Sequence, residues 1–295
     1  MSFDLNFGRL DGTIPSVEDM KEYFQGFSSV QVNDTDPGGV QFWYQNEVTG
    51  VYCSFSYSPD DVDEEFDQVN QFSASGLSFN LNYIRPSFFA YETMPLVQGF
   101  CEKFELLVED VQEDRVEAAN ASKLIQSWRM HNERAVGALA DDKDVETRYL
   151  PEERATEWWR YTSIKQSLED SLSDDIFVPS IMILENVEKR LFTMVVWTKG
   201  ISQFFPDCDY VLVQRDKKKL FGSKEEVGLV PFDAVMDWLS SNLDEYVMDG
   251  GPVKYLSPDK MPAVVSAIQN LTLLPIDLSQ HTRVAADGFH DVILT

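Results

Sequence analysis

Apolar and polar residues alternate through the first third of the chain, and this alternation predicts an antiparallel sheet. Each alternating run is five to seven residues long, as strands with one buried face are. Thr49-Gly50 separates two of the runs, so we expect a hairpin there. Asp36-Pro37-Gly38-Gly39 is expected to be a turn. The predicted strands cover residues 3–7, 40–46, 51–57, 77–83 and 105–111.

Two helices are expected beside this sheet. Ser16 begins the first, because its hydroxyl and the acid at Asp19 form a variant of the capping box. Apolar residues then recur on one stripe as far as Phe27. The second helix is predicted at 88–104. Antiparallel strands with helices to one side are typical of an α+β fold.

The rest of the chain predicts a helical segment followed by a second α+β unit. Residues 118–139 and 152–172 have helical spacing of apolar positions, with Trp128 in the first and Tyr161 in the second. Further strands are expected at 176–184, 190–198, 209–215, 227–230 and 290–294, and further helices at 231–248 and 257–271. The predicted fold is therefore α+β, with two antiparallel-sheet-plus-helix units, 1–114 and 173–295, joined by a helical segment at 115–172.

Composition narrows the function classes. The 295 residues include 50 acidic and 24 basic side chains, for a net charge of −26. A hydrophobic content of 43% excludes a disordered chain in spite of this charge. The acidic balance argues against binding to nucleic acid or to an anionic membrane surface. We expect no membrane span and no secretory signal, and three widely spaced cysteines favour a reducing cytoplasm.

The negative charge is concentrated near the N-terminus. Residues 1–114 hold 21 acidic and four basic side chains. One interpretation of the densest part is a solvated loop that aids solubility, and another is a landing surface for a basic protein partner. A calcium loop is disfavoured because the block has no glycine. The six acids of this block are Asp60, Asp61, Asp63, Glu64, Glu65 and Asp67.

Aromatic side chains supply a second candidate for partner binding. Phe42-Trp43-Tyr44 lies on a predicted strand, so Trp43 points away from the face that its two neighbours share. One face should be core, and the other an exposed aromatic surface beside the acidic field. Trp43 and Tyr44 are therefore our candidate partner contacts, with core packing as the alternative. Trp158 and Trp159, adjacent on a helix, should not share one buried stripe.

Motifs for catalysis, cofactors and metals were sought without success. The chain has no glycine-rich phosphate loop, no serine-nucleophile elbow and no zinc-ligand spacing. Two acids flank Cys208 and should raise the pKa of its thiol, which disfavours a reactive thiolate. A metal site at His281 and His290 with nearby aspartates is a minor alternative to an exposed C-terminal loop. We therefore name no catalytic residue and expect no cofactor or metal.

Several segments resemble those of uncharacterised bacterial cytoplasmic proteins that are similar to immunity proteins of polymorphic toxin systems. These segments are the opening Met1 to Phe7, residues 41–44 with 49–52, residues 77–83, and residues 209–213 before a lysine-rich turn. The resemblance implies a cytoplasmic binding protein that neutralises a basic partner, such as a toxin domain, by occluding its active surface. It transfers no functional residue by position.

Two other functions stay open from the sequence. One is a small-molecule enzyme, such as a hydrolase, whose carboxylates the sequence does not single out. The other is a chaperone or adaptor for a secreted effector, which would also be acidic. A halophilic origin would explain the charge without a partner, although halophile proteins usually spread their acids over the whole surface.

Overall fold

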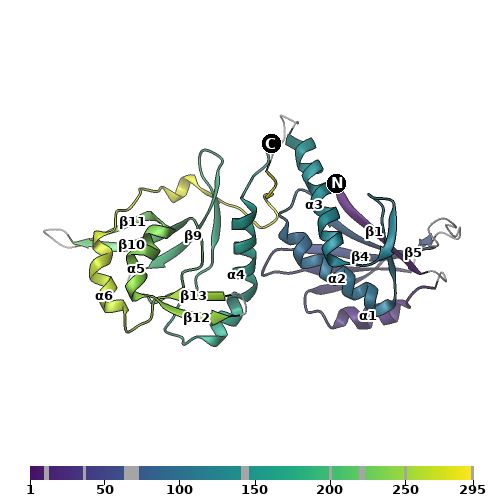
Figure 1. The fold of residues 1–295 in the computed structure, drawn as a ribbon, viewed down its shortest axis with the longest axis horizontal. Coiled ribbons are helices and arrows are strands. Elements are labelled where there is room, and N and C mark those ends of the chain that lie inside the picture. The colour runs from purple at the N-terminus through teal and green to yellow at the C-terminus, as the bar shows by residue number, and fades with distance from the viewer. Residues whose placement is uncertain are drawn as a thin grey trace. The chain divides into compact units, whose positions relative to one another are not determined.

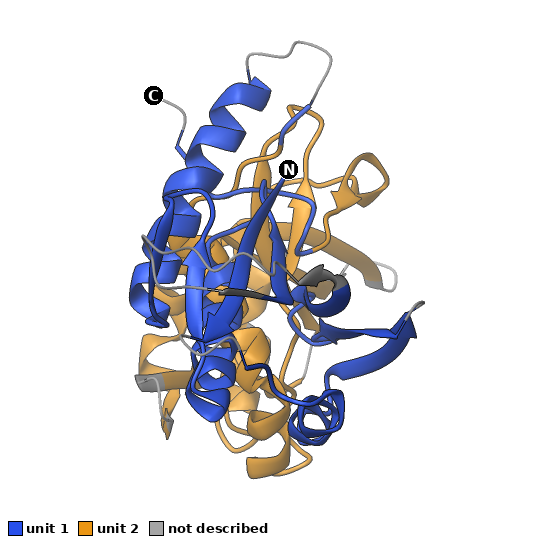
Figure 2. Ribbon diagram, turned by 90° about the vertical axis from the view of Figure 1, so that its right-hand side faces the viewer, with its two compact units in different colours: residues 1–147, 286–295 blue, residues 148–285 orange. Residues whose placement is uncertain are grey.

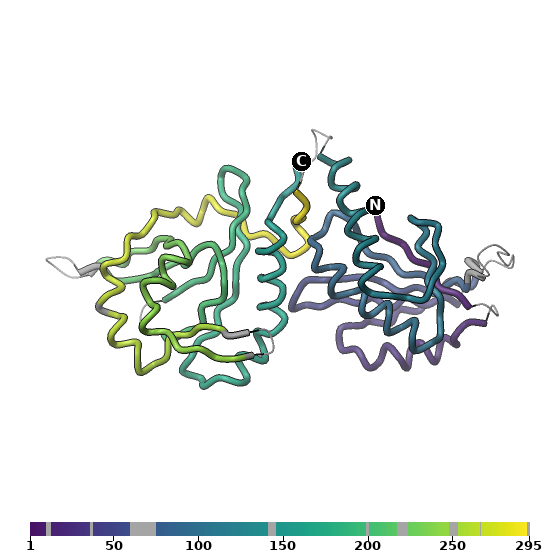
Figure 3. The backbone as a smooth tube through the Cα atoms, viewed as in Figure 1, coloured from purple at the N-terminus to yellow at the C-terminus, as the bar shows by residue number. Residues whose placement is uncertain are grey.

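The computed structural model describes residues 1–9, 13–35, 38–62, 73–140, 146–198, 201–218, 223–248 and 251–293. Two compact units divide the chain (Figure 2). Unit 1 holds residues 1–147 and 286–295, and unit 2 holds residues 148–285. The chain therefore passes from unit 1 through unit 2 and returns to unit 1 for its last residues (Figure 3).

Unit 1 is built on a seven-stranded sheet in which all neighbouring strands are antiparallel. The strand order is β2-β3-β4-β5-β1-β6-β7. Gly38, at a φ of +92°, lies in the predicted turn between β2 and β3, where a left-handed conformation favours glycine. The strands are β1 Ser2–Arg9, β2 Val30–Thr35, β3 Gly39–Gln45, β4 Tyr52–Val62, β5 Ser73–Asn82, β6 Leu107–Asp110 and β7 Arg115–Ala118.

Three described helices of unit 1 all contact the same face of this sheet (Figure 1). They are α1 Val17–Gln25, α2 Phe88–Phe104 and α3 Ala121–Ala140. The ring of Phe24 on α1 stacks on Phe42 at 4.4 Å, and Phe100 on α2 contacts Phe7 and Phe55. On α3, Ser127 donates a hydrogen bond to Asp110 of β6 at 2.5 Å. Ser16 caps α1 through its hydroxyl, as the sequence predicted.

The C-terminal residues of the chain complete unit 1. The carboxylate of Asp291 accepts hydrogen bonds from the backbone N–H of Ser87 at 2.8 Å and from its hydroxyl at 3.1 Å, just before α2. The predicted strand at 290–294 is wrong for its described residues, 290–293, which form no strand. Asp291 instead places a negative charge at the N-terminus of a helix, where the helix dipole favours it.

Unit 2 contains a five-stranded mixed sheet and a separate hairpin. The sheet order is β11-β10-β9-β8-β14, and β9 and β10 run parallel while the other neighbouring strands are antiparallel. The sheet strands are β8 Met182–Glu185, β9 Leu191–Thr198, β10 Tyr210–Lys218, β11 Ser223–Pro231 and β14 Thr282–Arg283. The hairpin pairs β12 Asp244–Met248 with β13 Gly251–Tyr255.

Three helices of unit 2 frame its main core: α4 Glu152–Ser171, α5 Phe232–Leu239 and α6 Met261–Ala267. Short 3₁₀ turns occupy Ser240–Asn242, Ile268–Asn270 and Leu278–Gln280. Trp197 of β9 is fully buried in this core with Leu168 of α4 and Leu239 of α5. Trp158 also packs against it, and its indole N–H donates to the carbonyl oxygen of Ile181.

The α+β class is confirmed, with particular corrections. The second sheet is not purely antiparallel, because a crossover makes β9 and β10 parallel. The helix expected at 231–248 ends at Leu239, and residues 244–248 alternate as a strand instead. The segment 115–172, expected to join two units, is divided between them, with α3 in unit 1 and α4 in unit 2. In the described residues, no helix is both long and apolar enough to cross a membrane.

Candidate functional site

The face of the unit 1 sheet that the helices leave uncovered is polar. Strand register places Asp4 opposite Asn80, Asn80 opposite Ser54, and Ser54 opposite Trp43, so these side chains form a row across four strands. Most of them are partly exposed, whereas the alternate residues of the same strands are buried. We call this surface the polar face. Its other members include Ser2, Asn6, Gln41, Gln45, Ser56, Ser78 and Asn82.

Two carboxylates are held in place on the polar face. Asp4 accepts hydrogen bonds from the amide of Asn80 at 2.6 Å and from the hydroxyl of Ser2 at 2.8 Å. Glu109 of β6 accepts one from the amide of Asn6 at 2.8 Å. Carboxylate oxygens have further lone pairs after these bonds form. The polar face therefore offers oriented acceptors to cationic or N–H-bearing groups.

A row of two aromatic rings and one guanidinium lies at the end of β4 near its hairpin with β3. Trp43 stacks on Tyr52 with a centroid distance of 5.7 Å and an interplanar angle of 17°. Arg85 lies 5.8 Å from the centre of the Tyr52 ring and donates two hydrogen bonds to its hydroxyl oxygen. Trp, Tyr and Arg are the residues most enriched at the energetic centres of protein interfaces. We call these three residues the Trp–Tyr–Arg row.

The backbone before Arg85 is strained. Ile84 has a φ of +62°, which is unfavourable for a β-branched residue. The buried amide of Asn132 on α3 holds this conformation, because its oxygen accepts from the N–H of Ile84 at 2.7 Å and its nitrogen donates to the carbonyl oxygen of Arg85 at 3.0 Å. Strain of this kind persists only where surrounding contacts enforce it. The contacts of Asn132 thus fix the backbone from which Arg85 projects.

Tyr44 lies on the opposite side of β3 from Trp43, as the strand alternation predicted. It is buried, and its hydroxyl donates to Glu92 of α2 at 2.8 Å. Asn46 and Thr49 donate to the same carboxylate oxygen. Burial, with the adjacent Glu92 charge, raises the pKa of Tyr44. Of the two candidate aromatic residues, Trp43 lies on the polar face. Tyr44 instead connects the β3–β4 hairpin to α2 through its hydrogen bond with Glu92.

The acidic block is separated from Trp43 along β4. Asp60 and Asp61 lie within β4, where the sequence predicted a loop, and Asp63, Glu64, Glu65 and Asp67 lie outside the described residues. Ser54 pairs with Trp43, and Asp60 follows it by six positions. At 3.3 Å per residue, this separation is about 20 Å along the strand. Asp60 and Asp61 of β4 are therefore well separated along the strand from Ser54, the residue that pairs with Trp43 of β3.

The described cysteines and acids do not form a recognisable catalytic or metal site. All three cysteines are buried, and burial is the main cause that raises the pKa of Cys101 and of Cys208 to about 12. The acids beside Cys208 raise its pKa less than burial does. Within the described ranges, no three His, Cys, Asp or Glu side chains lie together as metal ligands.

One cluster in unit 2 contains a serine, a lysine and an aspartate, which the sequence analysis missed. Ser257 donates to Asp244 at 2.6 Å, and Lys260 donates to the other oxygen of the same carboxylate. The hydrogen bond from Lys260 is the largest cause that lowers the pKa of Asp244. A carboxylate with a lowered pKa is a weak base, so this arrangement is an ion pair and not an activated serine.

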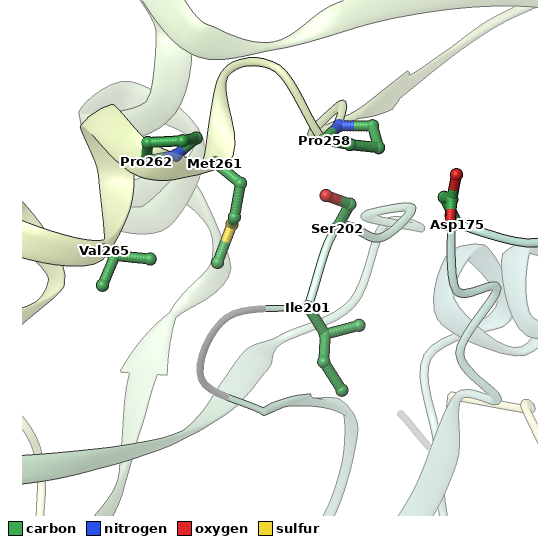
Figure 4. A pocket seen from close by; sticks show the side chains of 7 residues that line it. All are labelled: Asp175, Ile201, Ser202, Pro258, Met261, Pro262 and Val265. Atoms are coloured by element: carbon green, nitrogen blue, oxygen red, sulfur yellow. The ribbon is translucent and has the colours of Figure 1, made fainter.

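An open pocket of about 540 Å³ is lined in part by Pro258 and Met261, which directly follow Ser257 and Lys260 in the chain (Figure 4). Met261 and Val265 of α6 face Ile201 and Ser202 across it, and Asp175 lies on the far side. Ile201 is 38% exposed, so the walls enclose little of the volume. Sites for small molecules usually enclose most of the ligand surface, and this pocket does not.

Compared with protein-family models, with curated proteins and with solved structures, the chain matches none of them. The similarity to immunity proteins therefore stays a prediction. The functional argument rests on the surfaces of the chain itself. Among these surfaces, the polar face and the Trp–Tyr–Arg row of unit 1 combine exposure, oriented charge and aromatic area.

Proposed function

We propose that this protein binds a basic protein partner through unit 1 and neutralises it by covering its active surface. A bacterial toxin domain, with this chain as its cytoplasmic immunity protein, is the partner that the resemblance implies. The observation that carries the proposal is the pairing of charge with a preformed surface. Unit 1 holds 29 acidic and nine basic side chains, a net charge of −20, and unit 2 holds 21 and 15, a net charge of −6.

Each part of the surface has a physical role in this proposal. The charge of unit 1 speeds encounter with a basic protein, because complementary fields steer diffusion. The oriented carboxylates of Asp4 and Glu109 then accept hydrogen bonds from lysine or arginine side chains. Trp43 and Tyr52 supply flat apolar area of the kind that dominates binding energy. Charge thus accounts for the association rate, and the aromatic pair for the lifetime of the complex.

The test starts with capture of a partner by the tagged protein and proceeds to kinetics with the purified pair. In one variant, Asn or Gln replaces the six acids of the block. A matched control removes six exposed acids of unit 2 in the same way, so both variants have the same net charge. The control positions are Glu153, Asp174, Glu188, Asp233, Asp237 and Asp259.

We expect neutralisation of the block to lower the association rate about tenfold at low salt and to flatten its salt dependence. The control should have a smaller effect. Trp43→Ala should raise the dissociation rate by ten- to a hundredfold, as loss of about 1.5–3 kcal/mol does. Equal kinetics for all variants would overturn the proposal. Failure to capture any protein would also count against it and would favour the enzyme alternative.

A further inference from the structure

The outer edge of the unit 1 sheet is an uncovered strand. β2 lies at one end of the strand order, and of its six residues only Val30 is partly buried. The side chains from Gln31 to Thr35 are all exposed, and Val32 is 38% exposed. The strand contains no lysine and no proline, two residues that commonly protect sheet edges.

The register of the β2–β3 hairpin identifies the backbone groups that face outward. The N–H of Gln45 donates to the carbonyl oxygen of Ser29 at 2.8 Å, so these opposed residues form a hydrogen-bonded pair. Such pairs alternate along an antiparallel ladder, which directs the backbone groups of Gln31 and Asn33 toward β3. Those of Val32 and Asp34 point away from the sheet. The edge therefore presents two N–H and two C=O groups in strand geometry.

The other edges of the two larger sheets are shorter, charged or covered. β7 has four residues, and its Glu117 pairs with Arg115 of the same strand and with Lys123 of α3. On β11, Leu229 exchanges backbone hydrogen bonds with Leu274 at 2.9 and 2.8 Å. β14 has only two residues. Among these edges, β2 alone combines length with an uncharged centre and full exposure.

Charge beside β2 indicates what kind of strand it would accept. Lys21 of α1 forms an ion pair with Asp34 at 2.6 Å, which places that side of α1 next to the edge. Glu18 is exposed and lies three residues before Lys21, so the two side chains are neighbours on one stripe of α1. A strand added to β2 would direct every second side chain toward this stripe. Basic side chains at those positions would approach Glu18 and the carboxylate of Asp34, which is 76% exposed although Lys21 pairs with it.

We propose that β2 binds an extended strand of a protein partner by β-augmentation, with lysine or arginine at alternate positions facing α1. This inference rests on the proposed function for the basic character of the partner. A second copy of this chain fits less well, because pairing of two β2 edges would bring the acids of two α1 helices together. Backbone hydrogen bonds to Val32 and Asp34 supply the pairing, and the carboxylates of Glu18 and Asp34 supply the selection.

Amide hydrogen exchange measured by NMR tests the proposal residue by residue. The probe is an acetylated octapeptide of alternating lysine and threonine. At saturation we expect exchange at the amides of Val32 and Asp34 to slow at least tenfold, with little change at Gln31 and Asn33, whose N–H groups already face β3. Glu18→Gln should weaken peptide binding several-fold without changing the fold, because this side chain is exposed.

Control peptides and variants separate strand addition from charge attraction. An octapeptide of alternating lysine and proline has the same charge but cannot form the ladder, and it should protect neither amide. Val32→Pro removes an outward N–H and should abolish binding, whereas Val32→Ala should retain it. Equal effects of the two peptides, or no protection by either, would overturn the proposal. Protection that rises with protein concentration in the absence of peptide would assign the edge to a second copy instead.

The outcome is separable from that of the proposed function. The edge variants leave the polar face and the acidic block intact. If β2 shows no strand addition while the Trp43 and acidic-block variants impair partner binding, the further inference fails and the proposed function stands. If β2 shows strand addition while the Trp43 and acidic-block variants leave partner binding unchanged, the edge remains a binding site. The polar face is then excluded as one.

Discussion

The two sheets of this protein differ most on their second faces. β1 alternates strictly, so Phe3, Leu5 and Phe7 are buried beneath the helices while Asp4 and Asn6 lie on the polar face. β9 has the sequence LFTMVVWT and is apolar on both faces. Strands that are buried on both faces have nearly continuous hydrophobic sequences. The sequences of individual strands therefore already distinguish the two sheets.

The second face of the unit 2 sheet has its own small core. Met194, Leu212 and Leu184 are buried there with Leu229, and Ile276 from the chain after α6 packs against them. Unit 2 thus covers both faces of its sheet with its own chain. The helices of unit 1 cover one face and leave the other polar, with Trp43 and Tyr52 partly exposed. The two units therefore share a fold class and differ in whether the second face of the sheet is apolar or polar.

Alanine substitutions in the two second faces give the largest expected difference. Leu212→Ala in unit 2 should lower the free energy of unfolding by about 3 kcal/mol, because it leaves a cavity in a closed cluster. Ser78→Ala on the polar face of unit 1 should cost less than about 0.5 kcal/mol. Denaturation followed by hydrogen exchange of β10 and β5 peptides measures each unit separately. A cost at Ser78 that matched the cost at Leu212 would show that the polar face is a structural core.

Elements with a strong apolar period were predictable from the sequence. α2 occupies the predicted range 88–104, and the stripe of α1 with Met20 and Phe24 is buried as expected. β2 was missed because VQVNDT carries almost no buried residue, so an exposed edge strand has no hydrophobic signal. The β12–β13 hairpin was missed because the helical spacing before it, through Leu243, continued the pattern of α5.

The candidate site was predictable only in part. The alternation of β3 placed Trp43 and Tyr44 on opposite faces, as the structure has them. Arg85 was not singled out, because its position depends on the strained Ile84 and on Asn132, which is 47 residues further along the chain. Tertiary contacts of this kind leave no local pattern. Composition showed where the charge lies in the sequence, and only strand register showed that Asp60 and Asp61 lie six and seven residues along β4 from Ser54, the partner of Trp43.

Both units also use a strand arginine to bind carbonyl groups at the end of a helix, and the burial of these arginines differs. Arg9 of β1 donates to the carbonyl oxygen of Phe104, the last residue of α2. Arg215 of β10 is 5% exposed, donates to the carbonyl oxygens of Ile268 and Leu271, and pairs with Glu226. The sequence predicted a strand over 209–215 that ends at Arg215, but β10 continues to Lys218.

We expect the buried arginine to contribute more to stability. Arg215→Met should cost about 2–3 kcal/mol, because it leaves two carbonyl groups without their donor and breaks a partly buried ion pair. Arg9→Met should cost about 1 kcal/mol, since water can replace its more exposed bonds. Urea denaturation of each variant, with exchange measured per unit, checks the ranking. A reversed order would mean that unit 1 depends more on its helix-end contact than unit 2 does.

The smallest expected effect concerns the side-chain contacts that stabilise one hairpin in each unit. Glu92 of α2 accepts hydrogen bonds from the uncharged side chains of Tyr44, Asn46 and Thr49 in unit 1, whereas Asp244 pairs with the cation of Lys260 in unit 2. The pair with Lys260 holds the pKa of Asp244 below its ordinary value of 3.8. Its stabilisation is therefore present above that ordinary value and is lost as the pH falls through the lowered pKa.

Lys260→Met should accordingly destabilise unit 2 by about 0.5 kcal/mol near neutral pH, as partly exposed ion pairs do, and by nothing measurable in strong acid. Lys224→Met is the matched control, because Lys224 is exposed on β11 and makes no ion pair among the described residues. Thermal unfolding between pH 2 and pH 7 measures the difference between the two variants at each pH. A difference that stayed constant over this range would assign the contribution of Lys260 to its bond with the carbonyl oxygen of Leu243 and to packing of its aliphatic stem. A stability difference between the two variants that grew with pH would show that the ion pair makes the β12–β13 hairpin sensitive to acid. The β3–β4 hairpin of unit 1 has uncharged donors to Glu92 in place of this ion pair.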